Sequence, residues 1–397
     1  MTAVPGAVRA GPNVGRNRGV AMQSFVIPMD EAQPQPLRAY GIVYRALQQG
    51  ATADWLLNHR GGSFLVHHPA AYEDSLERGV MTESADDLEL GEYELSLSGG
   101  VAPVRLEVAP EIAVYAPRYA APWDDAVRLA LEFADIPYRV VWDRDVLGAE
   151  LADIDWLHLH HEDFTGQYGK YGLNVQSTDW YREAVRVDRE TATELGFGDT
   201  RSLKRAIATA IREYVNQGGF LFAMCAATET LDLALAGDPP EFSDTLSFAD
   251  FALEPGDVGP FSTIDGHRVN TPDRRVLDTV QLAEFAPTVD PVAAMLTQNH
   301  HLRFPDWYGL TTSFRPSVLK PGVLVLATCA DRSLAKYLHG DLGAGTFTFL
   351  GGHDPEDPQH AIGDPPTDLE YHPRSPGYRL ILNNVLFPAA RQEERKT

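Results

Sequence analysis

The stretch GGFLFAMCAATETLD, residues 218–232, places a thiol where an apolar run gives way to small residues and helix formers. FLFAMC is typical of a buried strand and ATETLDLALAG of a helix, so Cys225 is expected at a strand–turn–helix corner. Such a corner holds its central side chain above the sheet, beside backbone N–H groups that can stabilise a thiolate and an oxyanion. Cys225 is therefore a candidate nucleophile. The alternative is a small buried residue that fills a tight corner.

The same alternation of strands and helices runs along most of the chain. Upstream, SFVIPM, PQPLRAYGIVYRALQQG and ADWLLN form a β-α-β start that is consistent with a parallel pair. Downstream, EIAVYAP, YRVVW, DIDWLHLHH, GVLVLATC and GTFTFLGG are predicted strands, and PWDDAVRLALEFADI, SLKRAIATAIREYVNQGG and GYRLILNNVLFPAA are predicted helices. We therefore predict an α/β fold with a mainly parallel sheet, in which ligands gather at the carboxyl ends of the strands.

The 397 residues divide into three predicted segments. Residues 1–23 are rich in Gly, Pro, Asn and Arg, which predicts a disordered leader. Residues 24–108 are expected to form an N-terminal α/β unit, and residues 109–397 the main domain, with a soft boundary near Pro110.

Composition narrows the possible partners and the compartment. The formal net charge of −23 repels nucleic acid and anionic membrane surfaces, so we expect neither as a partner. No apolar run approaches the roughly 20 residues that span a bilayer. The chain has only two cysteines, Cys225 and Cys329, which is typical of a reducing compartment. We expect a cytoplasmic protein that acts on a small molecule.

The segment GTFTFLGGHDPEDPQH predicts a second strand that ends in candidate catalytic residues. It delivers His353 to the same edge of the sheet as Cys225, and a thiol nucleophile needs a base within hydrogen-bond reach. His353 is the first choice for that base, with Asp354 or Glu356 to orient its ring. The alternative is that His353 caps a loop and the acidic residues are merely solvated.

A third strand end, HLHHEDFTGQYGKYG, is rich in imidazoles and carboxylates. His158 and His160 point to one face of the strand, and His161, Glu162 and Asp163 follow where it should end. This cluster could bind a divalent metal, line a polar substrate pocket or form a structural network. The predicted substrate-binding residues are His158, His160, His161, Glu162, Gln167, Ala226 and His300, of which Ala226 offers its backbone N–H and His300 is also an alternative base.

The order of these motifs resembles the class I glutamine amidotransferase-like superfamily. The resemblance covers residues 110–392 and rests on the Cys225 corner, on the late strand with Gly343, Gly345 and His353, and on the closing YRLILNNVLFPA helix. The late strand looks most like the ThuA-like branch, and the MCAATE corner like the thiol amidotransferase branch. The resemblance implies a flavodoxin-like sheet with helices on both faces, and a Cys-His-Glu triad in which Cys225 matches the nucleophile and His353 the base.

The whole chain is also similar to bacterial proteins commonly labelled asparagine synthetase B. That chemistry needs an N-terminal cysteine nucleophile, where this chain has Thr2, and a loop in which Asp-Ser follows Ser98-Gly99-Gly100. Both are missing, so we do not expect synthetase activity.

Three hypotheses follow from these patterns. The first is a thiol-dependent hydrolase or amidotransferase-like protein that cleaves a small amide or ester through Cys225 and His353. The second is a non-catalytic or metal-assisted ThuA-like protein that binds a small polar or sugar ligand through its His and Glu cluster. The third is an assembly role, in which the N-terminal unit mediates homo-oligomerisation.

Overall fold

The computed structural model describes most of the two predicted folded segments. The described residues are 24–57, 59–85, 102–117, 125–160, 162–166, 177–235, 280–282, 290–297, 314, 316, 319–329, 334–357 and 365–390. The predicted leader and the site candidates His161, Gln167 and His300 lie outside these residues. Within the described part, no helix combines the length and the apolar character needed to cross a bilayer.

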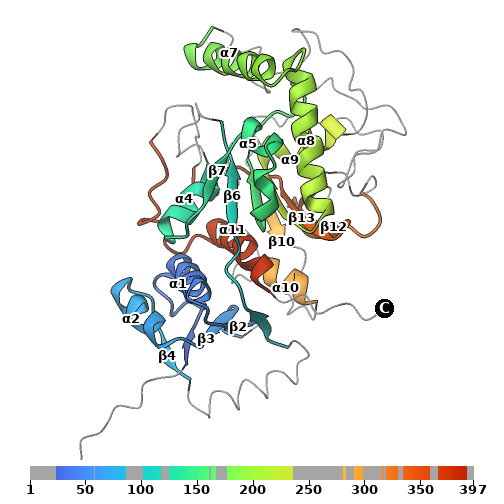
Figure 1. Cartoon of the computed structure of the whole chain (residues 1–397). Coiled ribbons are helices and arrows are strands. Elements are labelled where there is room, and N and C mark those ends of the chain that lie inside the picture. Colours follow the sequence, from blue (N-terminus) through green and yellow to red (C-terminus); the bar gives the residue numbers. More distant parts are fainter. Residues whose placement is uncertain are drawn as a thin grey trace, which may run out of the picture.

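Within the described residues, the larger sheet contains eight strands in the order β10-β11-β12-β13-β9-β8-β6-β7. Strands β6, β7, β10, β12 and β13 are labelled in Figure 1. Its parallel strands are β6 (Ile112–Tyr115), β7 (Arg139–Val141), β8 (Trp156–Leu159), β9 (Phe220–Met224) and β13 (Gly345–Leu350). Beyond β13, the sheet continues with three antiparallel strands, β12 (Ala335–Leu342), β11 (Leu324–Cys329) and β10 (Val280–Leu282). The fold is therefore mixed α/β with a parallel-containing sheet, as the sequence predicts.

Helices cover both faces of this sheet because successive strand residues point in opposite directions. Leu157 and Leu221 pack with Ile207 and Ile211 of α8 (Thr200–Asn216) on one face. Residues of α9 (Cys225–Leu235) share that core, with α5 (Asp143–Leu147) and α7 (Asp179–Glu194) packed on α8. The other face is covered by α4 (Ala126–Phe133), α10 (Pro291–Thr297) and α11 (Pro376–Leu386). Two short 3-10 helices, η2 (Glu150–Asp153) and η5 (Phe387–Ala389), complete this part.

The described N-terminal residues form a separate sheet of five strands in the order β4-β1-β3-β2-β5. Its strands are β1 (Phe25–Ile27), β2 (Ala53–Leu56), β3 (Ser63–Val66), β4 (Glu83–Ser84) and β5 (Val104–Leu106), with α1 (Pro36–Gln48) and α2 (Pro69–Glu77) between them in sequence. The order β-α-β of the first elements is confirmed, but the parallel pair is wrong. A turn at Gly61 and Gly62, both with positive φ, folds β3 back between β1 and β2, and every pairing in the sheet is antiparallel.

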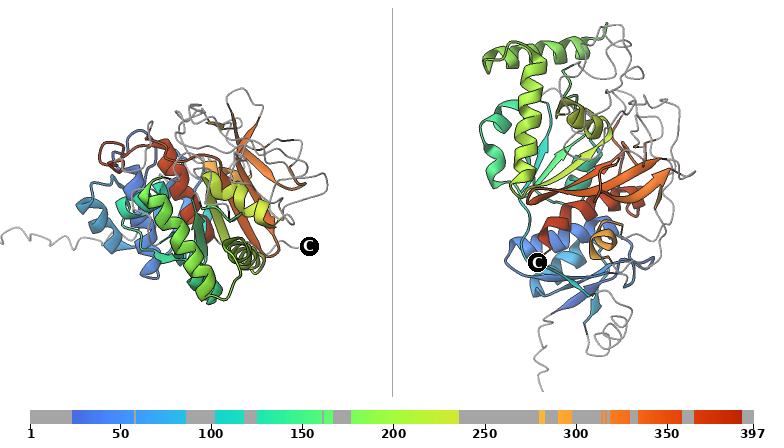
Figure 2. Two further views of the ribbon diagram at one scale, coloured as in Figure 1. Left: turned by 90° about the horizontal axis from the view of Figure 1, so that it is seen from above. Right: turned by 90° about the vertical axis from the view of Figure 1, so that its right-hand side faces the viewer.

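The two sheets share one apolar core, with helices α1, α4 and α11 between them (Figures 1 and 2). Every residue of α11 is buried, which is expected of a helix with protein on all sides. Its polar residues are bonded inside this layer: Arg379 donates to the backbone oxygen of Met29 at 3.0 Å, and Asn384 to the hydroxyl of Tyr337 at 2.8 Å. Helix α11 therefore connects the N-terminal part to the large sheet.

Candidate functional site

The corner after β9 has the backbone strain expected of a nucleophile elbow. Cys225 begins α9 with φ of 48°, a left-handed conformation that costs a non-glycine residue about 1 kcal/mol or more. The N–H of Cys225 donates to the carbonyl of Gly352 at 3.1 Å, and the N–H of Ala227 to the carbonyl of His160, also at 3.1 Å. The corner is therefore fixed to the chain segments that follow both neighbouring strands. The thiol side chain is completely buried.

The candidates His160, Cys225 and His353 come from distant parts of the sequence and lie at the same edge of the sheet. His160 follows β8 and His353 follows β13, and β9 lies between these two strands. The two imidazole rings lie with their centroids 4.5 Å apart, and both are buried. Ala226 lies in the first turn of α9. Two buried imidazoles thus come together at the sheet edge where the buried thiol lies.

The two acids predicted to orient His353 have described partners on the α11 side. Asp354 accepts hydrogen bonds from the hydroxyl of Tyr378 at 2.9 Å and from the hydroxyl of Thr367 at 3.1 Å. Burial raises the pKa of Asp354. The Oε2 atom of Glu356 lies 3.2 Å from Nδ1 of His372. These contacts fasten the loop after β13 to the start of α11, and the orienting role of Asp354 and Glu356 stays a prediction.

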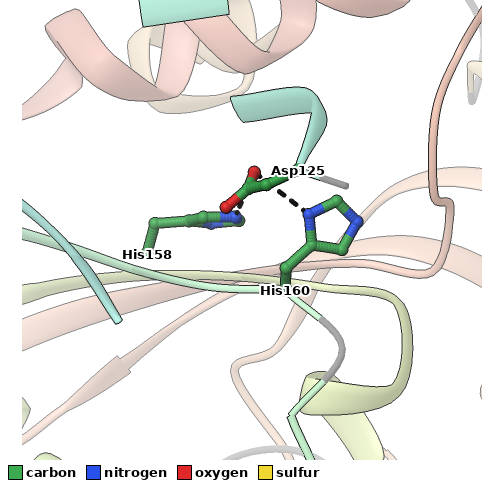
Figure 3. A group of neighbouring side chains, drawn as sticks. All are labelled: Asp125, His158 and His160. Atoms are coloured by element: carbon green, nitrogen blue, oxygen red, sulfur yellow. Dashed lines mark hydrogen bonds and ion pairs between the residues drawn. The ribbon is translucent and has the colours of Figure 1, made fainter. Parts of the chain in front are cut away.

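A carboxylate that the sequence reasoning missed lies between two of the predicted histidines. The Oδ1 atom of Asp125 is 3.1 Å from Nδ1 of His160 and 3.3 Å from Nε2 of His158 (Figure 3). The same oxygen caps α4, because it accepts the N–H groups of Val127 at 2.8 Å and Arg128 at 3.2 Å. The signal was present in PWDDAVRLALEF, where an Asp directly precedes a helical apolar pattern.

Electrostatics in this cluster favour the ionised carboxylate. Burial raises the pKa of Asp125, but the charges and hydrogen bonds of His158 and His160 more than offset it, so the pKa lies well below its usual range. The side chains of His158 and His160 are 0% and 1% exposed, and that of Asp125 is 8% exposed. One ligand atom from each of the three residues lies within 4.8 Å of the others. The group therefore has the donor types and the spacing of a metal site.

Glu162, predicted to bind substrate, has a described contact with the backbone. Its Oε2 accepts the N–H of His160 at 2.8 Å, and its carbonyl accepts the hydroxyl of Thr230 at 2.7 Å. These bonds shape the turn that follows β8 and hold it against α9. Its substrate-binding role stays a prediction.

A second buried polar cluster lies at the carboxyl ends of β6 and β7. Lys204 of α8 pairs with the carboxylate of Asp143 at 2.8 Å, lies 3.7 Å from Asp188 and sits 3.9 Å from the ring centroid of Trp142. Burial lowers the pKa of Lys204, but the charges of the two acids raise it by more. The net pKa is therefore raised, and the ammonium form is favoured. This cluster ties α5, α7 and α8 to the sheet on the face opposite Asp125.

Comparison with known proteins gives only distant likenesses. No protein-family model and no curated protein matches the chain. A cytoplasmic protein from Salmonella typhimurium is similar over 71% of this chain and 100% of its own, at 13% identity and a TM-score of 0.37. A candidate GMP synthase component from Thermoplasma acidophilum is similar over 70% of this chain and 94% of its own, at 9% identity and a TM-score of 0.33. A β-galactosidase from Bacillus circulans sp. alkalophilus is similar over 69% of this chain and 32% of its own, at 11% identity and a TM-score of 0.34. At these scores the likenesses support no conclusion about fold or activity.

Proposed function

We propose that this protein is a thiol-dependent hydrolase of the class I glutamine amidotransferase-like type, acting on a small amide or ester through Cys225. The observation that carries the proposal is the positive φ of Cys225 at the junction of β9 and α9. Strain of this kind persists only where the surrounding structure imposes it, and it is concentrated at functional sites. Glycine adopts a positive φ without strain. If the residue at this corner only had to fill space, glycine would therefore be the less costly choice.

The topology of the parallel strands supports the same proposal. In chain order β6, β7, β8, β9 and β13 are the first to fifth parallel strands, and their order in the sheet is second, first, third, fourth, fifth. This is the flavodoxin-like order, in which ligands bind outside the carboxyl ends of the strands. Cys225, His160 and His353 all follow such ends.

The proposed reaction has two steps. The Cys225 sulfur attacks the substrate carbonyl carbon, the bond to the amine or alcohol breaks, and His353 passes the thiol proton to the leaving group. In the second step, water attacks the thioester carbonyl and His353 takes a proton from it. The carbon–sulfur bond then breaks, His353 returns the proton to the sulfur, and the carboxylic acid is released. The N–H of Ala226 at the start of α9 would hold the oxyanion in both steps. Because the thiol is completely buried, substrate binding must be accompanied by movement of the side chains that cover it.

The first test is the rate at which iodoacetamide alkylates Cys225 across pH, read by peptide mass spectrometry with Cys329 as the internal control. An unperturbed thiol titrates near a pKa of about 8.5, whereas an activated one titrates well below that value. The covering side chains must also move aside for the reagent, and we then expect modification of Cys225 that is faster than that of Cys329 and persists to about pH 6. A thiol that is inert in the native protein, or no faster than Cys329, would contradict the proposal.

Two variants connect that reactivity to the histidine. His353→Gln should move the alkylation midpoint of Cys225 upward, because the imidazole that we propose as the partner of the thiolate is gone. His339→Gln is the matched control, since His339 is also buried but bonds to Thr348 on the neighbouring strand at 3.0 Å. Burial lowers the pKa of His339 to about 4, so it carries no charge at neutral pH and its removal should leave the midpoint unchanged. Hydrolysis of a panel of small amides and esters, abolished in Cys225→Ala, would complete the test.

A further inference from the structure

One oxygen of Asp125 has more polar neighbours than a carboxylate oxygen can accept hydrogen bonds from. Oδ1 accepts two backbone N–H groups of α4 and also lies within 3.3 Å of an imidazole nitrogen of both His158 and His160. A carboxylate oxygen has two lone pairs, so these four polar neighbours are more than it can bond to as a hydrogen-bond acceptor. A single cation bound to the oxygen and to both nitrogens would replace the two direct oxygen–imidazole contacts.

The ring of His158 gives independent evidence for a cation. Its Nδ1 lies 3.0 Å from the backbone oxygen of Phe222, and a carbonyl oxygen only accepts, so Nδ1 carries a proton. If the ring is neutral, the lone pair of Nε2 then points at the Asp125 carboxylate 3.3 Å away, which is repulsive. Either a second proton or a metal ion must lie on that side. Metal-bound histidines commonly donate their other N–H to a backbone carbonyl in this way.

The two distances from the Asp125 oxygen to the imidazole nitrogens fit coordination as well as hydrogen bonding. Bonds of about 2.0–2.1 Å to a tetrahedral Zn²⁺ place neighbouring ligand atoms about 3.3 Å apart. The Asp125 oxygen is 3.1 Å and 3.3 Å from its two imidazole nitrogens. His158 lies in β8 and His160 directly follows it, so the two side chains point to the same side, and the α4 cap brings Asp125 against them (Figure 3).

We propose that Asp125, His158 and His160 bind one divalent transition-metal ion. Two imidazoles and one carboxylate suit Zn²⁺ or another first-row ion rather than Mg²⁺ or Ca²⁺, which prefer oxygen ligands. Three protein ligands leave a coordination position for water or a small ligand. The backbone groups of Phe222 and Val127, which bond to the ligand side chains, orient them from the outer shell. This site does not depend on the proposed thiol chemistry.

The test uses the full chain, stripped with a chelator and then titrated with Zn²⁺ or with Mg²⁺ alone. We expect saturable binding of one Zn²⁺ per chain with a rise in the melting temperature, and no response to Mg²⁺. Asp125→Asn keeps an N-cap acceptor but removes the charge, and should weaken Zn²⁺ binding by at least about 10-fold. His158→Gln should do the same. Wild-type protein that shows no saturable Zn²⁺ binding would overturn the proposal, whatever the variants do.

Two controls place the ion at this cluster. His67→Gln removes another histidine, which lies 2.7 Å from a carboxylate on the small sheet, and should bind Zn²⁺ as the wild type does. Cys225→Ser should also keep the full stoichiometry, which separates this site from the proposed nucleophile. If Asp125→Asn and His158→Gln bind as the wild type does, or if Cys225→Ser loses the ion, the proposed ligand set is wrong.

Discussion

Among the residues that the structure describes, histidine and aspartate side chains meet beside each of the two sheets. On the small sheet, His67 lies 2.7 Å from Asp54, and the two side chains are 30% and 19% exposed. At the edge of the large sheet, Asp125 lies between His158 and His160 and all three are buried. The residue types and distances are similar, but the first group is partly solvated and the second is removed from water.

The difference shows how surroundings decide what such a group contributes. In the partly exposed group, water and salt screen the charges, and Arg105 supplies a further partner for Asp54 at 2.8 Å. In the buried group no bulk water is at hand to compensate for a lost partner, and leaving a buried polar atom unpaired costs about 1–3 kcal/mol. The buried clusters of the large sheet should therefore respond far more strongly to substitution than the group on the small sheet.

The largest effect is expected for the buried cluster on the opposite face of the large sheet. Lys204→Met keeps the apolar stem of the side chain but leaves Asp143 and Asp188 buried without their cation. Removing one partner of a buried ion pair costs about 3–5 kcal/mol. We expect a loss of that order in the free energy of unfolding, measured with urea at pH 7.

The control is an ion pair of the same part of the fold that faces solvent. Arg144 and Glu194 are 2.6 Å apart, but their side chains are 57% and 60% exposed. Arg144→Met should change the free energy of unfolding by less than about 1 kcal/mol. Equal losses for Lys204→Met and Arg144→Met would show that burial does not set the strength of these ion pairs.

The next effect is expected at Asp125. In metal-free buffer, Asp125→Ala removes the cap of α4 and the acceptor of His160, for a combined loss of about 2–3 kcal/mol. Asp125→Asn retains a capping oxygen and should lose less. Urea unfolding of the two variants measures the difference, and a loss in Asp125→Ala no greater than in Asp125→Asn would show that the cap contributes nothing.

Much of the large sheet could be predicted from sequence because its signals are local. The strand around FLFAMC, the closing helix at Pro376–Leu386 and the late strand at Gly345–Leu350 are each marked by an apolar pattern and a turn residue. The prediction of a parallel pair in the small sheet was wrong, because strand pairing depends on residues that are distant in the sequence. Nothing in SFVIPM or ADWLLN reports that a third strand folds back between them.

The candidate site divides in the same way. His160, Cys225 and His353 could be placed at one edge because each follows a predicted strand, and carboxyl ends of parallel strands lie together. Asp125 could not be paired with His160 from sequence, since their contact depends on how α4 packs against the sheet. The partners of Asp354 were missed for a similar reason, because Tyr378 and Thr367 reach it only when α11 docks.

A smaller effect is expected for the group on the small sheet. A double-mutant cycle with His67→Gln and Asp54→Asn, followed by urea unfolding at pH 7, should give a coupling free energy of about 0.2–1 kcal/mol. The coupling should shrink in 1 M salt, because the charges are partly exposed. A coupling above about 2 kcal/mol would place this partly exposed group with the buried clusters and break the comparison.

The smallest effect concerns the titration of Asp54. Burial raises its pKa, but hydrogen bonds from His67 and Arg105 and their charges outweigh this, so the pKa is lowered. A carboxyl whose pKa is lower in the folded state adds stability above its unfolded pKa of about 3.9, and that stability is lost as the pH falls below this value. The difference in unfolding free energy between wild type and Asp54→Asn should therefore shrink as the pH falls below about 3.9. NMR titration of the Asp54 carboxyl gives the direct measurement: its midpoint should lie below about 3.9 and rise in His67→Gln, and an unchanged midpoint in that variant would mean that Arg105 alone sets it.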